Sequence, residues 1–175
     1  MKKINYYIPI IVVVLGCNQS HTDVQKPKDF GDKIEALVLE ENNIGQEYGF
    51  KINNKNETLE YTVTYLGSLS KSKNKILHTG ILSGNKDSPH YNAYLVIYSQ
   101  NNKRIGKYYI GSNDSLKLSN DTLIIEGFAD CDQTTQISFR DSIPKQIFIK
   151  CREDKEHIFG DIYGFETEEE IEKQR

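Results

Sequence analysis

The sequence predicts an all-β fold, mainly antiparallel, built as a β-sandwich or a barrel-like sheet. A series of short segments between residues 48 and 127 is rich in β-branched and aromatic residues, which are favoured in strands. Clusters of Asn, Gly, Ser and Lys separate these segments at short intervals. Strands joined by tight turns pair antiparallel, whereas a parallel α/β fold needs long helical crossovers.

The first expected element is one short N-terminal helix over residues 32–41. Asp32 suits its N-cap, and the segment 42–45 contains the Asn and Gly residues that end helices. The run 36–39 is also short and apolar enough to form a buried strand. The helix is favoured because three apolar residues follow a helical period: Ile34, Leu37 and Val38.

The remaining elements are strands, and one pair of them forms a hairpin with a defined register. The turn Asn101-Asn102 separates two strongly apolar runs, and a hairpin closed there sets Leu95 against Tyr108 and Tyr94 against Tyr109. The predicted strands, in chain order, are Tyr48–Ile52, Leu59–Leu66, Lys75–Leu82, Tyr91–Ser99, Arg104–Ile110 and Thr122–Gly127.

Both faces of this hairpin are apolar enough to be buried, so we expect a central strand pair covered on two sides. The alternative leaves a tyrosine-rich face exposed for a partner, with Tyr94, Tyr98 and Tyr109 as the contact residues. One face has Ala93, Leu95, Ile97, Tyr108 and Ile110, and the other has Tyr94, Val96, Tyr98, Ile105 and Tyr109.

Cys131 and Cys151 are predicted to form a disulfide. Residues 133–139 and 145–150 look like two strands of a hairpin, and a turn centred on Asp141 sets the two cysteines opposite each other. Such a bond contributes about 3 kcal/mol in the chain-entropy model. Carboxylates on both sides of Cys131 disfavour a reactive thiolate, and the spacing lacks the paired short intervals of zinc modules. In the same register Ile137, Phe139, Ile147 and Ile149 share the face of the cysteines.

The sequence contains no catalytic motif that we can identify, and we expect no cofactor and no metal site. No nucleophile elbow, zinc-protease motif or phosphate-binding glycine loop is found. The pair His157 and Asp161 is interpreted as a surface pair without a role. The formal net charge is −3 and becomes −5 without residues 1–16, which contain two lysines, and this mild acidity argues against a nucleic-acid partner, which requires a clustered basic face.

The N-terminus carries a targeting signal. Lys2 and Lys3 precede an apolar run, and Val14-Leu15-Gly16-Cys17 follows it. The tetrapeptide resembles the lipobox of bacterial lipoproteins, and the resemblance covers residues 1–17 alone. It implies that residues 1–16 are a signal peptide and that Cys17 carries acyl chains such as palmitate. Two or more chains hold a protein stably at a membrane.

The resemblance also implies a location in the cell envelope, and in the outer membrane, on its periplasmic or surface face, if the host is Gram-negative. We expect Cys17 and a polar tether over residues 17–30, a single β-rich domain over 31–165 and an acidic tail over 166–175. The function expected from these features is a non-enzymatic binding module for an envelope protein or glycan, of an inhibitor, immunity or assembly type. The alternative is a hydrolase of envelope polymers that uses paired carboxylates.

Overall fold

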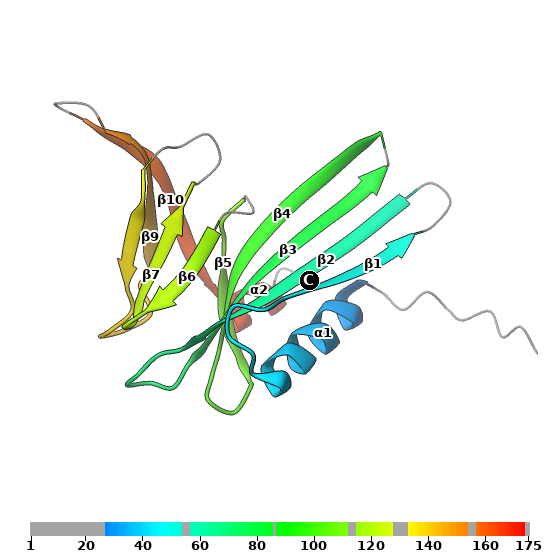
Figure 1. Cartoon of the computed structure of the whole chain (residues 1–175), viewed down its shortest axis with the longest axis horizontal. Coiled ribbons are helices and arrows are strands. Elements are labelled where there is room, and N and C mark those ends of the chain that lie inside the picture. Colours follow the sequence, from blue (N-terminus) through cyan, green and yellow to red (C-terminus); the bar gives the residue numbers. More distant parts are fainter. Residues whose placement is uncertain are drawn as a thin grey trace, which may run out of the picture.

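In a computed structural model, the chain folds as two antiparallel β-sheets with two short helices (Figure 1), so the predicted fold class is confirmed. The structure describes residues 27–53, 57–85, 87–111, 115–127, 133–153 and 157–173. The helices are α1 (Pro27–Glu41) and α2 (Glu168–Lys173). The strands are β1 (Glu47–Asn53), β2 (Glu57–Ser68), β3 (Lys75–Asn85), β4 (Ser88–Tyr98), β5 (Arg104–Tyr109), β6 (Ser115–Ser119), β7 (Thr122–Glu126), β8 (Thr135–Ser138), β9 (Gln146–Glu153) and β10 (Ile158–Thr167).

The larger sheet has seven strands in the order β1-β2-β3-β4-β5-β10-β9, and the smaller has β6-β7-β8. The larger sheet separates two hydrophobic cores. On one face α1 packs mainly against β2, and Val38, Val63, Leu77 and Val96 are buried between the helix and the sheet. On the other face the three-stranded sheet buries Leu123 and Ile125 against Leu95 and Ile97 of the larger sheet, among other residues. Figure 1 shows β6 and β7 lying over the β9–β10 end of the larger sheet, away from α1.

Helix α1 begins at Pro27, where proline is tolerated in the first turn. The predicted N-cap at Asp32 is therefore wrong, and the expected tether overlaps the helix over residues 27–30. The predicted stripe is also wrong in part, because Leu37 is 54% exposed whereas Ile34 and Val38 are buried. Asn42 ends the helix in a left-handed conformation (φ 55°), and its N–H donates to the Val38 carbonyl at 3.1 Å.

The hairpin of β4 and β5 has the predicted register, with Tyr94 opposite Tyr109 and Leu95 opposite Tyr108. A bulge follows, because Ile97 pairs with Gly106 whereas Tyr98 pairs with Arg104. The extra residue is Ile105, which consequently packs with the core between the two sheets. Its predicted position on the tyrosine face is therefore wrong, and Arg104 lies opposite Tyr98 instead.

The predicted hairpin between residues 133–139 and 145–150 is wrong. Strand β8 pairs with β7 in the small sheet, and β9 pairs with β10 in the large one. The local pattern suggested a hairpin because the inward-facing residues of both strands do lie in one core. Ile137 and Phe139 reach this core from the small sheet, and Ile147 and Ile149 reach it from the large sheet. The segment between the strands crosses from one sheet to the other, where the Pro144 carbonyl accepts a hydrogen bond from the Tyr108 hydroxyl.

Strands β6 and β10 are additional to the predicted strands. The expected acidic tail begins within β10 and continues as α2, whose Ile171 is 7% exposed. A capping box starts α2: the Thr167 N–H and hydroxyl both donate to the Glu170 carboxylate at 2.8 Å. These two hydrogen bonds lower the pKa of Glu170. Among the described residues, no helix has the length and apolar character that crossing a bilayer requires.

Candidate functional site

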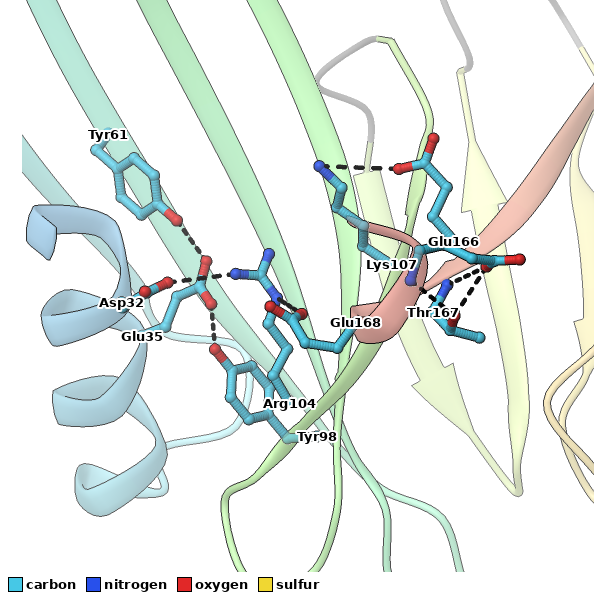
Figure 2. A network of polar contacts seen from close by, with 10 residues as sticks. Asp32, Glu35, Tyr61, Tyr98, Arg104, Lys107, Glu166, Thr167 and Glu168 are labelled. Atoms are coloured by element: carbon cyan, nitrogen blue, oxygen red, sulfur yellow. Dashed lines mark hydrogen bonds and ion pairs between the residues drawn. The ribbon is translucent and has the colours of Figure 1, made fainter. Parts of the chain in front are cut away.

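An extended polar network is centred on Glu35, a helix residue with only 2% of its surface exposed. Figure 2 shows its carboxylate pointing away from the helix axis toward the sheet, between Tyr61 of β2 and Tyr98 of β4. The hydroxyl of Tyr61 donates to one carboxylate oxygen and that of Tyr98 to the other. Both oxygens therefore have a partner, as a buried carboxylate requires.

The pKa values of Tyr61 and Tyr98 are shifted by this buried position beside Glu35. Burial raises the pKa of both phenols well above the usual value, and the neighbouring Glu35 carboxylate raises it further. Tyr61 and Tyr98 consequently stay protonated and act as hydrogen-bond donors at any physiological pH. They do not serve as acid–base groups there.

Arg104 connects the two helices on this face of the sheet. One terminal nitrogen of its guanidinium lies 3.3 Å from the Asp32 carboxylate on α1, and its Nε lies 3.5 Å from the Glu168 carboxylate on α2. Burial of the guanidinium lowers its pKa, but Glu35 and other nearby groups outweigh this effect, and the pKa is raised. Arg104 thus remains a cation with carboxylates from both helices around it (Figure 2).

The Glu35 carboxylate connects α1 to the sheet and is poorly placed for acid–base catalysis. A general acid or base needs an accessible proton and a place for a substrate atom, whereas both oxygens of Glu35 are engaged and shielded. A pocket of about 460 Å³ does lie beside Arg104, lined by Ser99, Lys103, Arg104, Ile105, Thr167, Glu168 and Glu169. Its charged groups include Arg104 and Glu168, which already face each other.

A second, more accessible group lies on the same face. The rings of Tyr94 and Tyr109 have centroids 5.4 Å apart and are tilted by 58°. The Lys107 ammonium lies 4.3 Å from the centre of the Tyr94 ring and 4.0 Å from the Glu166 carboxylate. Tyr109 is 43% exposed, whereas Tyr94 is half-buried beside the α1 core. We call these four residues the tyrosine surface.

The expected docking residues are thus placed in two different environments. Tyr94 and Tyr109 lie together, and Tyr109 is open to solvent. Tyr98 is 6% exposed and donates to Glu35, so its ring is part of the core rather than of an accessible patch. Burial of the ring raises the pKa of Tyr94, and the nearby Tyr109 and Glu166 raise it further.

The cysteines are described only in part. Cys17 and Cys131 lie outside the described residues, whereas Cys151 of β9 is disulfide-bonded. The pairing of Cys131 with Cys151 and the lipid on Cys17 stay predictions. Over the residues that the structure describes, no group of three or more metal-ligating side chains comes together.

Sequence reasoning missed the network around Glu35 and Arg104. The signal available was the position of Glu35 directly after Ile34 in the apolar stripe of the helix, where a charge needs a partner. Its partners are 26 and 63 residues away, and no local pattern connects them. Comparisons of the chain with protein-family models, with curated proteins and with solved structures find no match.

Proposed function

We propose that this protein is a lipid-anchored binding module of the bacterial cell envelope, without enzymatic activity, that holds a protein or glycan partner through its tyrosine surface. The observation that carries the proposal is the Tyr94–Tyr109 pair. Tyr109 exposes 43% of its surface, although it belongs to a strand in the interior of the seven-stranded sheet. Aromatic side chains of this kind supply much of the binding energy at interfaces.

The surroundings of the pair support the proposal. The Lys107 ammonium packs against the Tyr94 ring in a cation–π contact, and the Glu166 carboxylate forms an ion pair with Lys107. Two rings on neighbouring strands lose little conformational entropy when a partner covers them, because their strands are already fixed. The same face supports the hydrolase alternative less well. Its best shielded carboxylate, Glu35, accepts a hydrogen bond on each oxygen and is not free to act as an acid or a base.

The contact surface can be tested by site-specific photo-crosslinking in intact cells of the native host. A photoreactive phenylalanine analogue at position 109 should give a discrete adduct with an envelope protein or glycan. The same analogue at position 37, which is 54% exposed on α1, is the matched control and should give none. A Lys107→Glu change in the position-109 variant should reduce the adduct several-fold by disturbing the Tyr94 ring. Equal labelling at positions 37 and 109, or none at 109, would contradict the proposed surface.

The membrane anchor is tested separately. Replacing Cys17 with Ala should abolish metabolic labelling with palmitate and move the chain from the membrane to the soluble fraction, because the acyl chains supply the anchoring energy. A Ser20→Ala variant, changed three residues further on, is the control and should keep both label and location. Retention of the label by the Cys17→Ala variant would show that the lipid is attached elsewhere or that the lipobox assignment is wrong.

A further inference from the structure

A cavity of about 300 Å³ lies between two loops and is separate from the tyrosine surface. One wall is the turn between β2 and β3, residues 69–74, and the other is the start of the segment from β8 to β9, residues 139–143. Figure 1 shows both loops at the same end of the molecule, at the lower left. Leu69 and Phe139 belong to the core between the two sheets, and Ile143 packs against that core. We call this space the loop cavity, and its volume lies at the lower end of the range for ligand pockets.

Asp121, in the turn between β6 and β7, connects the two walls of the loop cavity. Its carboxylate accepts a hydrogen bond from the Ser70 N–H at 2.7 Å, and its backbone carbonyl accepts one from the Phe139 N–H at 2.7 Å. Asp121 is itself buried, with 8% of its surface exposed. The first wall is also closed internally, because the Leu69 N–H donates to the Asn74 carbonyl at 2.8 Å. The protein's own hydrogen bonds therefore fix both walls, and a fixed site binds a ligand at a lower entropic cost.

The floor of the loop cavity is apolar. Leu69 is 3% and Phe139 is 2% exposed, and Ile143 is partly buried beside them. An apolar cavity of about half this volume is enough to hold a benzene ring. The floor can therefore cover an apolar group of about that size.

The rim of the loop cavity is charged. Lys71 lies on one wall, Arg140 and Asp141 lie on the other, and all three residues are exposed. Among the described residues, no ion pair involves Lys71 or Arg140. Two positive charges and one negative charge leave the rim with an excess of one positive charge. The guanidinium of arginine suits a carboxylate especially well, because the two groups form paired hydrogen bonds.

We propose that the loop cavity binds a small amphipathic carboxylic acid. The apolar part of the ligand, about the size of one aromatic ring, lies on Leu69, Phe139 and Ile143. Its carboxylate lies between Arg140 and Lys71, which reach it from opposite walls. The ligand's single negative charge matches the excess positive charge of the rim. This inference goes beyond the proposed function, because the loop cavity and the tyrosine surface share no residue.

Other classes of ligand fit these residues less well. An amine would pair with Asp141 but would also meet the like charges of Lys71 and Arg140. A divalent cation needs several oxygen ligands, whereas over the described part of the chain no three metal-ligating side chains come together. A neutral molecule would use the apolar floor but would gain nothing from the charged rim. An acid is the class that uses both parts of the cavity.

Fluorine NMR of the full-length protein in nanodiscs of neutral phosphatidylcholine tests the charge preference. The probe is para-fluorophenylacetate, whose fluorine signal should broaden in proportion to the protein concentration. Two further probes share its ring: para-fluorophenylacetamide is neutral, and para-fluorophenethylamine is a cation. We expect the acid to bind several-fold more tightly than the amide and the amine to bind most weakly. Fluoroacetate, an acid without the ring, should not bind, and protein-free nanodiscs measure uptake by the lipid.

Substitutions at the rim should change the affinity for the acid in opposite directions. Arg140→Gln and Lys71→Gln each remove a cation and should raise the Kd of para-fluorophenylacetate about two- to five-fold, as expected for exposed ion pairs. Asp141→Asn removes a negative charge beside Arg140 and should lower that Kd about two-fold. The matched control is Lys145→Gln, an exposed lysine that does not line the cavity, and it should leave the Kd unchanged. All four residues are exposed, so thermal unfolding should be unaffected.

Three results would overturn the proposal. Equal affinity for the acid, the amide and the amine would show that the charged rim does not select the ligand. Equal losses for Arg140→Gln and Lys145→Gln would show that the acid is drawn to positive charge in general and not to this cavity. Broadening no greater than in protein-free nanodiscs, even at millimolar probe, would show that the cavity does not bind this class of ligand. None of these outcomes depends on whether position 109 has a partner.

Discussion

Replacing Glu35 with Leu should lower the free energy of unfolding by about 3–5 kcal/mol, mainly because it leaves two buried hydroxyls without their hydrogen-bond acceptor. The substitution takes the acceptors away from two tyrosine hydroxyls, Tyr61 and Tyr98, which are buried and remain protonated. Each buried hydroxyl left without a partner costs about 1–3 kcal/mol. It also removes a neighbouring negative charge from Arg104, whose guanidinium is mostly buried.

Urea unfolding followed by circular dichroism measures this effect, and two variants serve as controls. Asp32→Asn removes a carboxylate from the same arginine, but the Asp32 side chain is 55% exposed, so the loss should stay below about 1 kcal/mol. Glu35→Gln keeps the shape of the side chain and one acceptor oxygen, so its loss of unfolding free energy should lie between those of Glu35→Leu and Asp32→Asn. Similar losses for Glu35→Leu and Asp32→Asn would show that the buried network does not stabilise the fold as described.

Replacing Gly106 with Ala should cost about 3 kcal/mol, at the upper end of the range for overpacking. A Cβ at this position would lie 2.3 Å from the carbonyl oxygen of Glu166 and 2.7 Å from the Phe165 ring. A backbone oxygen in a paired strand cannot move aside as a flexible side chain can. The clash falls where β5 pairs with β10, with Gly106 opposite Thr167, so relief requires part of this pairing to open.

Gly164→Ala is the matched control for this substitution. Gly164 lies in β10, on the other strand of the same junction, but a Cβ there meets nothing within 4 Å. We expect a change within about 0.5 kcal/mol in either direction. The two variants are compared by thermal unfolding at the same pH and concentration. If both lose the same stability, the loss comes from the backbone preference of alanine and not from the close approach of β5 and β10.

The parts of the fold that could be predicted are those set by neighbouring residues. The turn at Asn101-Asn102 fixed the β4–β5 register, and Asn102 does adopt a left-handed conformation (φ 58°). The face of the sheet predicted for Ile105 was wrong, because one extra residue in a bulge reverses the face to which a side chain points. That bulge brings Arg104 to the tyrosine face, where it meets carboxylates of both helices. The alternation of apolar and polar residues in the sequence does not reveal this bulge.

The pairing of whole strands was harder to predict than their existence. Both β8 and β9 alternate apolar and polar residues, and that alternation shows which residues face inward but not which sheet each strand joins. Strand β10 contains Gly160, Asp161 and Gly164 among its apolar residues, which weakens the strand pattern. The candidate site depends on contacts of the same long-range kind, since Glu35 of the N-terminal helix meets tyrosines of β2 and β4.

The position of β10 in the large sheet has a consequence for the order of folding. Residues 158–167 form the strand between β5 and β9, and Phe165 pairs with Tyr108 across more than fifty intervening residues. Closing so long a loop is entropically costly and slows folding. Until β10 docks, β5 and β9 each lack a neighbour, and bare strand edges invite pairing with other chains. The chain is therefore most exposed to misassembly before β10 docks on β5, because β9 pairs with β10 alone and can join the large sheet only then.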